Sequence, residues 1–174
     1  MVFFDNVRLP ADALIGAAGK GAKLMFEGLN SERLLAAAAA LGIGDYALNK
    51  AASYARDRKP FGKPIGSYQA LQHRMALAKA ELEAARLMTY SAAERFDTGE
   101  DAGALANMAK LLASRAAVAA VEAAIQTHGG YAFDRDYDVV TLWPMVRLME
   151  IAPINNEMLL NYIGEHVLGL PKSY

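Results

Sequence analysis

The sequence predicts an all-α protein, an up-and-down four-helix bundle that follows a short extended N-terminal remnant of a β-domain. Two observations predict it. From about residue 22 onward the chain is dominated by Ala, Leu, Met, Glu and Lys, which favour helices, and its apolar side chains recur near the helical period. Glycines and prolines gather at a few points and divide this region into long segments joined by short turns, as in an antiparallel bundle.

Turn-forming residues mark the breaks between the expected helices. Prolines and glycines at 60–66 end the first helix, and Ser67 is a good N-cap for the second. The pair Gly129-Gly130 ends the third helix, and Pro153 stops the fourth. The expected helices cover about residues 22–57, 67–96 and 102–127, a shorter helix that reaches about 151, and a last helix at about 156–168.

The first 20 residues differ from the rest of the chain. Val2, Phe3, Phe4 and Val7 favour a strand, yet no partner strand follows them. We therefore interpret residues 1–20 as the tail of a preceding β-domain with its linker, and residues 21–174 as the helical bundle.

Composition excludes several classes of function. The 174 residues carry 18 Lys+Arg against 19 Asp+Glu, so no basic field favours nucleic acid or an anionic membrane. The chain has no cysteine, which excludes disulfides, thiolate zinc sites and a cysteine nucleophile. No signal peptide and no apolar stretch of membrane-spanning length is found. These features predict a protein of the cytoplasm.

Three local patterns fail as motifs. The glycine-rich segment at 16–23 lacks the Ser or Thr that follows Lys in a phosphate-binding loop. The acidic segment at 134–138 has Val139 where a calcium loop needs Gly. The three histidines are too far apart in the sequence for a local metal site, so we expect no metal.

Longer segments resemble the acyl-CoA dehydrogenase family. They read RKPFGKPIGSYQALQHRMA (58–76), QTHGGYAF (126–133) and MEIAPINNEM (149–158), with FFDNVRLP near the start and HVLGLPKSY at the end. The match covers the family's C-terminal helical domain and the end of its middle β-domain. It implies flavin-dependent removal of an α-proton and a β-hydride from an acyl-CoA thioester. Such an α-proton is weakly acidic, so a carboxylate must be held close to it in a dry pocket.

The resemblance also implies the residues that contact FAD. Arg58 is expected at the adenosine diphosphate part of FAD bound by a neighbouring subunit, where its fork suits phosphate oxygens. Glycines in the second segment would let the backbone approach the cofactor closely. Plainer interpretations are a surface ion pair for Arg58 and a helix stop for the glycines. The expected cofactor contacts are Arg58, Phe61, Gln69, Gln126, Thr127, His128, Gly129, Gly130, Asn155, Asn156 and Glu157.

The third segment departs from the commoner family pattern. Where many members keep the catalytic Glu, this chain has Pro153, which cannot act as a base. Some members, including isovaleryl-CoA and long-chain dehydrogenases, carry the base earlier in a stretch L-x-x-E-R, and residues 29–33 read LNSER. Glu32 is thus the expected catalytic base; alternatively it favours the helix dipole or pairs with Arg33. The expected substrate contacts are Asn30, Ser31, Arg33, Pro153 and Ile154.

Family members are about twice as long as this chain, so the resemblance leaves two hypotheses open. The first is part of an FAD-dependent acyl-CoA dehydrogenase, with an acyl-CoA substrate, an acceptor of the electron-transfer flavoprotein type, and a homodimer or homotetramer as its assembly. The second is a non-catalytic helical oligomerisation module, or one partner subunit of a split dehydrogenase.

Overall fold

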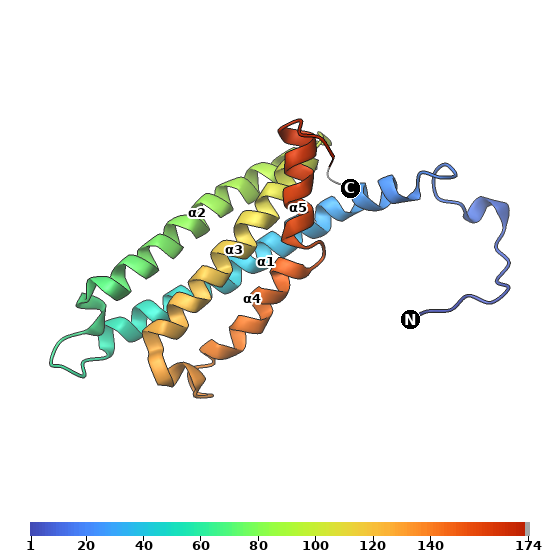
Figure 1. Ribbon diagram of the computed structural model, residues 1–174. Coiled ribbons are helices and arrows are strands. Elements are labelled where there is room, and N and C mark those ends of the chain that lie inside the picture. The colour runs from blue at the N-terminus through green and yellow to red at the C-terminus, as the bar shows by residue number, and fades with distance from the viewer. Residues whose placement is uncertain (173–174) are drawn as a thin grey trace.

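The structure is a computed structural model that describes residues 1–172. It is all-α, and the expected helices are confirmed within a few residues at each end (Figure 1). The helices are α1 (Gly21–Asp57), α2 (Gln69–Asp97), α3 (Gly103–His128), α4 (Leu142–Ile151) and α5 (Asn156–Tyr162). A π-helical turn, Ile163–Val167, extends α5 over the segment expected to continue that helix.

Helix α3 forms the centre of the bundle. It contacts α1, α2, α4 and α5, and α1, α2 and α3 run side by side over most of their length (Figure 1). Its buried face is made largely of alanine, including Ala106, Ala113 and Ala120. Small side chains allow helix backbones to approach closely, so the core lies in the narrow space between the three long helices.

The three long helices approach one another closely at Gly44 of α1. A Cβ placed on Gly44 would lie 2.7 Å from Leu82 Cδ2 on α2 and 3.4 Å from the Cα of Ala117 on α3. Leu82 is fully buried, so its side chain is enclosed by its neighbours in a close-packed core. Gly44 is therefore required by the packing of three helices, and no turn geometry is involved.

The N-terminal segment lies outside the bundle (Figure 1). Residues 1–20 are exposed and irregular apart from a short 3-10 turn at Ala11–Ala13. The first eight residues of α1, 21–28, are exposed as well. This agrees with the expected extended segment, whereas its assignment to a preceding β-domain stays a prediction. Within residues 1–172, no helix combines the length and apolar character needed to cross a membrane.

Candidate functional site

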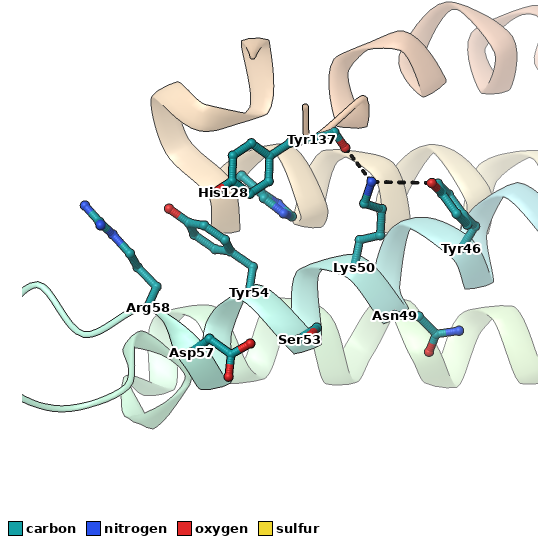
Figure 2. A pocket seen from close by; sticks show the side chains of 9 residues that line it. All are labelled: Tyr46, Asn49, Lys50, Ser53, Tyr54, Asp57, Arg58, His128 and Tyr137. Atoms are coloured by element: carbon teal, nitrogen blue, oxygen red, sulfur yellow. Dashed lines mark hydrogen bonds between the residues drawn. The ribbon is translucent and has the colours of Figure 1, made fainter. Parts of the chain in front are cut away.

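One face of α1 near its C-terminal end carries a row of polar and aromatic side chains. Tyr46, Lys50, Tyr54 and Arg58 follow one another at intervals of four residues, which places them on the same side of the helix. They line a cavity of about 660 Å³ together with His128 and four further residues (Figure 2). We call this the Tyr54 cavity.

Four rings pack together at the wall of the Tyr54 cavity. Tyr54 stacks on His128 with ring centroids 4.4 Å apart, and Tyr137 meets both rings edge-on at 5.5 Å. Tyr131 lies 6.4 Å from Tyr54 and 5.5 Å from Tyr137. Burial raises the pKa of the Tyr54 phenol. These contacts fix the end of α1 against the end of α3.

An ion pair closes the other side of the same cavity. Lys50 Nζ donates to Asp138 Oδ1 at 2.7 Å and to the carbonyl oxygen of Tyr137 at 2.7 Å. Burial acts to lower the pKa of Lys50, but hydrogen bonds with Asp138 and Tyr46 outweigh it and raise that pKa. Asp138 takes a left-handed backbone at φ 52°. The pair therefore fastens the loop after α3 to α1.

Two segments that the family resemblance assigns to FAD binding meet in a second cavity of about 600 Å³. Arg58 on one side and residues 126–130 on the other line it, and we call it the glycine cavity. It shares Tyr54, Arg58 and His128 with the Tyr54 cavity. The Arg58 guanidinium lies 5.4 Å above the ring of Tyr131 and, among the described residues, makes no ion pair.

The backbone of the glycine cavity is open to a ligand. Gly129 lies at φ 60°, and a Cβ built on Gly129 or Gly130 would meet nothing within 4 Å. By contrast, Thr127 and His128 are buried, and their side chains hydrogen bond to the carbonyl oxygens of Ala123 and Ala124. An exposed arginine beside accessible glycine backbone is a suitable donor set for phosphate oxygens, so these residues fit the pyrophosphate of a dinucleotide.

Two other residues expected to contact FAD lie apart from these cavities. Phe61 is 81% exposed at the tip of the loop between α1 and α2, and Gln69 is exposed at the first position of α2. Neither belongs to the lining of the Tyr54 or the glycine cavity. Their expected contact with FAD stays a prediction.

The expected substrate residues meet near the other end of the bundle. Asn30 and Arg33 of α1 line a cavity of about 440 Å³ with Ile154, and α5 contributes Met158 and Tyr162. We call this the Arg33 cavity. Ser31 is not part of its lining, and its hydroxyl donates to the carbonyl oxygen of Gly28 at 3.1 Å.

Arg33 is a buried cation that forms no ion pair with an acidic side chain in residues 1–172. It is 4% exposed. Its Nη1 donates to Asn30 Oδ1 at 2.6 Å and to the carbonyl oxygen of Phe26 at 3.3 Å. Its Nε has no partner among the described residues. Burial lowers the pKa of Arg33, against a smaller opposing effect from Tyr162. A buried guanidinium with a free donor beside a cavity is suited to bind a carbonyl or anionic oxygen.

Glu32 lies on a different face of α1 from Arg33. It is exposed, and it is the single charged residue in a stripe of otherwise uncharged, exposed positions. The stripe, which we call the Glu32 stripe, comprises Met25, Gly28, Glu32, Leu35, Ala39, Gly42 and Tyr46. Leu35 is 70% exposed and Met25 55% exposed. Glu32 is the twelfth residue of α1, so it lies too far from the N-terminus of that helix to interact with the positive end of the helix dipole.

The turn between α4 and α5 places the last group of expected residues. Pro153 and Glu157 are exposed, and Asn155 caps α5 by accepting a hydrogen bond from the Met158 amide at 2.8 Å. Asn156 is buried and its side chain bonds to Lys110 and Ser114. Its side-chain amide is thus engaged inside the protein; the expected roles of all four residues stay predictions.

Sequence reasoning missed several residues that line or support these cavities. The four-residue ladder of Tyr46, Lys50, Tyr54 and Arg58 is visible in the sequence and could have predicted a functional face of α1. Lys110 stands inside an alanine-rich run, which is a weaker signal of a buried polar role. The contribution of Tyr162 to the Arg33 cavity carries no local signal, because it depends on how α5 packs on α1.

Comparison with known proteins gives one consistent result. Residues 19–168 match the family model described as acyl-CoA dehydrogenase, C-terminal domain. An acyl-CoA dehydrogenase of Mycobacterium tuberculosis is 46% identical over 175 residues, which is 99% of this chain and 45% of that protein. The chain thus spans less than half the length of the curated relatives it matches.

Solved structures agree with this match. The butyryl-CoA dehydrogenase of Megasphaera elsdenii superposes with a TM-score of 0.88 at 34% identity, over 95% of this chain and 43% of that one. The FAD complex of PigA superposes with a TM-score of 0.88 at 33% identity, over 96% and 43%. The helical fold, the Arg58 and glycine segments and these matches together lead to one conclusion: the chain belongs to the acyl-CoA dehydrogenase family and corresponds to its C-terminal domain.

Proposed function

We propose that this chain is the C-terminal part of an FAD-dependent acyl-CoA dehydrogenase in which Glu32 is the catalytic base. The observation that carries the proposal is the Glu32 stripe. One carboxylate stands among exposed apolar side chains that need cover. Domains that precede this one in longer relatives would cover the stripe and leave Glu32 in a dry pocket. Apolar surroundings of that kind make a carboxylate a stronger base.

The residues present divide the work between two sites. Asn30 and Arg33 contact the CoA arm of an acyl-CoA in the Arg33 cavity, and the acyl end continues from there to the Glu32 stripe. Glu32 then takes the proton from the carbon next to the thioester carbonyl. FAD, when bound, supplies the acceptor for the hydride that leaves the neighbouring carbon. Arg58 and residues 126–130 hold the nucleotide half of FAD by its phosphates.

The same proposal includes the assembly and the electron acceptor. We propose a homodimer or homotetramer, because exposed apolar side chains on α2, such as Leu77 at 62% and Leu87 at 72%, need cover. Support for an acyl-CoA substrate and for an acceptor of the electron-transfer flavoprotein type comes from family membership.

The test is a substitution in the enzyme that carries the preceding domains. Glu32→Gln keeps the shape of the side chain and cannot accept a proton. Reduction of the flavin by acyl-CoA, followed by absorbance in a stopped-flow instrument, should slow by about 10²–10⁴-fold. Binding of the acyl-CoA should change little. A matched control is Glu122→Gln, an exposed glutamate of α3 outside the three cavities. Undiminished flavin reduction by Glu32→Gln would show that Glu32 is structural.

A further inference from the structure

Lys110 is the largest fully buried side chain of the described residues. It lies in the middle of α3 with alanine, methionine and leucine as its nearest neighbours in the sequence. An apolar side chain of similar length would fill this position without burying a charge. Burying an ammonium group is costly unless the group is hydrogen-bonded, so the role of Lys110 depends on what it binds.

The two observed partners of Lys110 lie where α4 gives way to α5: Ile154 is in the joining turn and Asn156 is the first residue of α5. Its Nζ donates to the carbonyl oxygen of Ile154 at 2.6 Å and to Asn156 Oδ1 at 3.0 Å. The other end of the Asn156 amide donates to Ser114 Oγ at 3.1 Å. Lys110 and Ser114 are four residues apart on α3 and thus share one face. Lys110 and Ser114 of α3 therefore hold the end of the α4–α5 turn and the start of α5.

The charged groups around Lys110 act at longer range. Glu150 on α4 and Glu157 on α5 favour its charged form, and Arg33 on α1 opposes it. Burial is the largest effect and lowers the pKa of Lys110 to about 8. Its hydrogen-bond partners are both neutral oxygens. A buried cation is weak evidence for added stability, because the cost of its desolvation offsets what its hydrogen bonds contribute.

The turn that Lys110 holds is one wall of the Arg33 cavity. Ile154 lines this cavity together with Arg33, and Asn155 caps the helix that brings Met158 and Tyr162 to the same lining. We propose that Lys110 is a positioning residue: by holding the carbonyl of Ile154 and the amide of Asn156, it sets the distance between the α4–α5 turn and Arg33. Its consequence for acyl-CoA binding rests on the proposed function, whereas its effect on cavity geometry does not.

The geometric test uses this chain without any ligand. Lys110→Met removes the ammonium and keeps the length of the side chain. Amide hydrogen exchange across residues 154–162 should accelerate at least about tenfold, the loss expected when a charge-assisted hydrogen bond is removed. The nitrogen-bound proton of Arg33 Nε should shift in the NMR spectrum, because Arg33 lines the same cavity as Ile154 and its Nε is buried without a hydrogen-bond partner among the described residues.

A matched control separates positioning from general loss of stability. Val121→Ala also weakens the fully buried face of α3, but Val121 is not part of the Arg33 cavity. Compared at equal global stability, it should leave the Arg33 Nε signal and the exchange at 154–162 unchanged. Asn156→Asp supplies a carboxylate oxygen to Lys110 and should retain both signals, whereas Asn156→Leu should reproduce the effects of Lys110→Met.

The outcomes decide the inference in either direction. If Lys110→Met alters only the global unfolding transition, or if Val121→Ala moves the same local signals equally, Lys110 is an ordinary core residue and the proposal is overturned. Should Lys110→Met fail to fold, Asn156→Leu carries the same test. In the enzyme with its preceding domains, Lys110→Met should raise KM for acyl-CoA about tenfold with a smaller change in kcat. A change of cavity geometry without that KM effect would count against the proposed function and leave the positioning role standing.

Discussion

At the scale of single residues, Lys110 predicts a pH dependence of stability. Its pKa in the folded chain, about 8, lies below the ordinary lysine value. Between those two pKa values the unfolded chain binds more protons at this position, so the free energy of unfolding should rise with pH by roughly 1 kcal/mol per unit. Below pH 8 both states are protonated and the contribution is constant.

Lysines and tyrosines in general titrate in the same pH range, so the effect of Lys110 is measured as a difference in unfolding free energy between the wild-type chain and a variant. Urea unfolding of the wild-type chain and of Lys110→Met is compared at several values between pH 7 and pH 10.5. The stability of the wild type relative to the variant should increase over this interval. A constant difference would mean that Lys110 keeps an ordinary pKa in the folded chain.

Pro153 gives a second prediction at this scale. It stands next to Ile154 of the Arg33 cavity, on the turn where commoner family members keep the base. In the complete enzyme, Pro153→Glu added to Glu32→Gln should recover roughly tenfold of the lost rate of flavin reduction. The control places glutamate at an exposed position of α5, with Leu160→Glu in the same background. No gain over this control would mean that the turn does not bring a carboxylate to the substrate.

At the scale of helices, two glycines of α1 predict effects of opposite sign. Gly42 is exposed and a Cβ there meets nothing within 4 Å, so Gly42→Ala should stabilise the chain by about 0.5–1 kcal/mol through helix propensity. Gly44→Ala gains the same propensity but presses against Leu82 at 2.7 Å, and overpacking of that kind costs about 1–3 kcal/mol.

Thermal unfolding of the two variants is a direct comparison, because both lie in one helix two residues apart. Gly42→Ala should raise the melting temperature, and Gly44→Ala should lower it. If both variants raised it, the space between α1, α2 and α3 would be looser than the packing of Leu82 indicates.

The helices were predictable because their determinants are local. Helix-forming composition and the breakers at 60–66, Gly129 and Pro153 gave boundaries close to those observed. The cavities were less predictable, because they depend on which ends of helices meet. The meeting of Arg58 with residues 126–130 came from family resemblance, and the stacking of Tyr54 on His128 needed the packing of α1 on α3. The buried role of Asn156 also appears only when α5 lies against α3.

At the scale of the whole molecule, α1 separates the two sites. It is continuous from Gly21 to Asp57, so its axis rises by about 38 Å between Glu32 and the helix end next to Arg58. Within one FAD molecule, the pyrophosphate is separated from the reactive ring by much less than this rise along α1. Within the proposed function, one catalytic centre must therefore take Glu32 from one copy of the chain and Arg58 from another.

This separation predicts complementation between inactive variants. Assemblies mixed from Glu32→Gln and Arg58→Ala chains of the complete enzyme should contain some centres with both residues intact, and activity should reappear after mixing and reassembly. Each variant reassembled with itself is the control. Absence of recovery in assemblies shown to be mixed would place both residues in a centre formed by one copy.

The alanine face of α3 has a consequence for how such a protein diversifies. Alanine gives up almost no side-chain freedom on folding, so the frame depends on close fit rather than on bulky apolar groups. Its buried positions can neither grow nor shrink without loss, while the positions around Glu32 are exposed in this chain and are limited only by the domains proposed to cover them. Substitutions on the exposed side of α1 can therefore change the chemistry around Glu32 while the alanine core stays the same. This is a route by which one fold comes to act on many acyl groups.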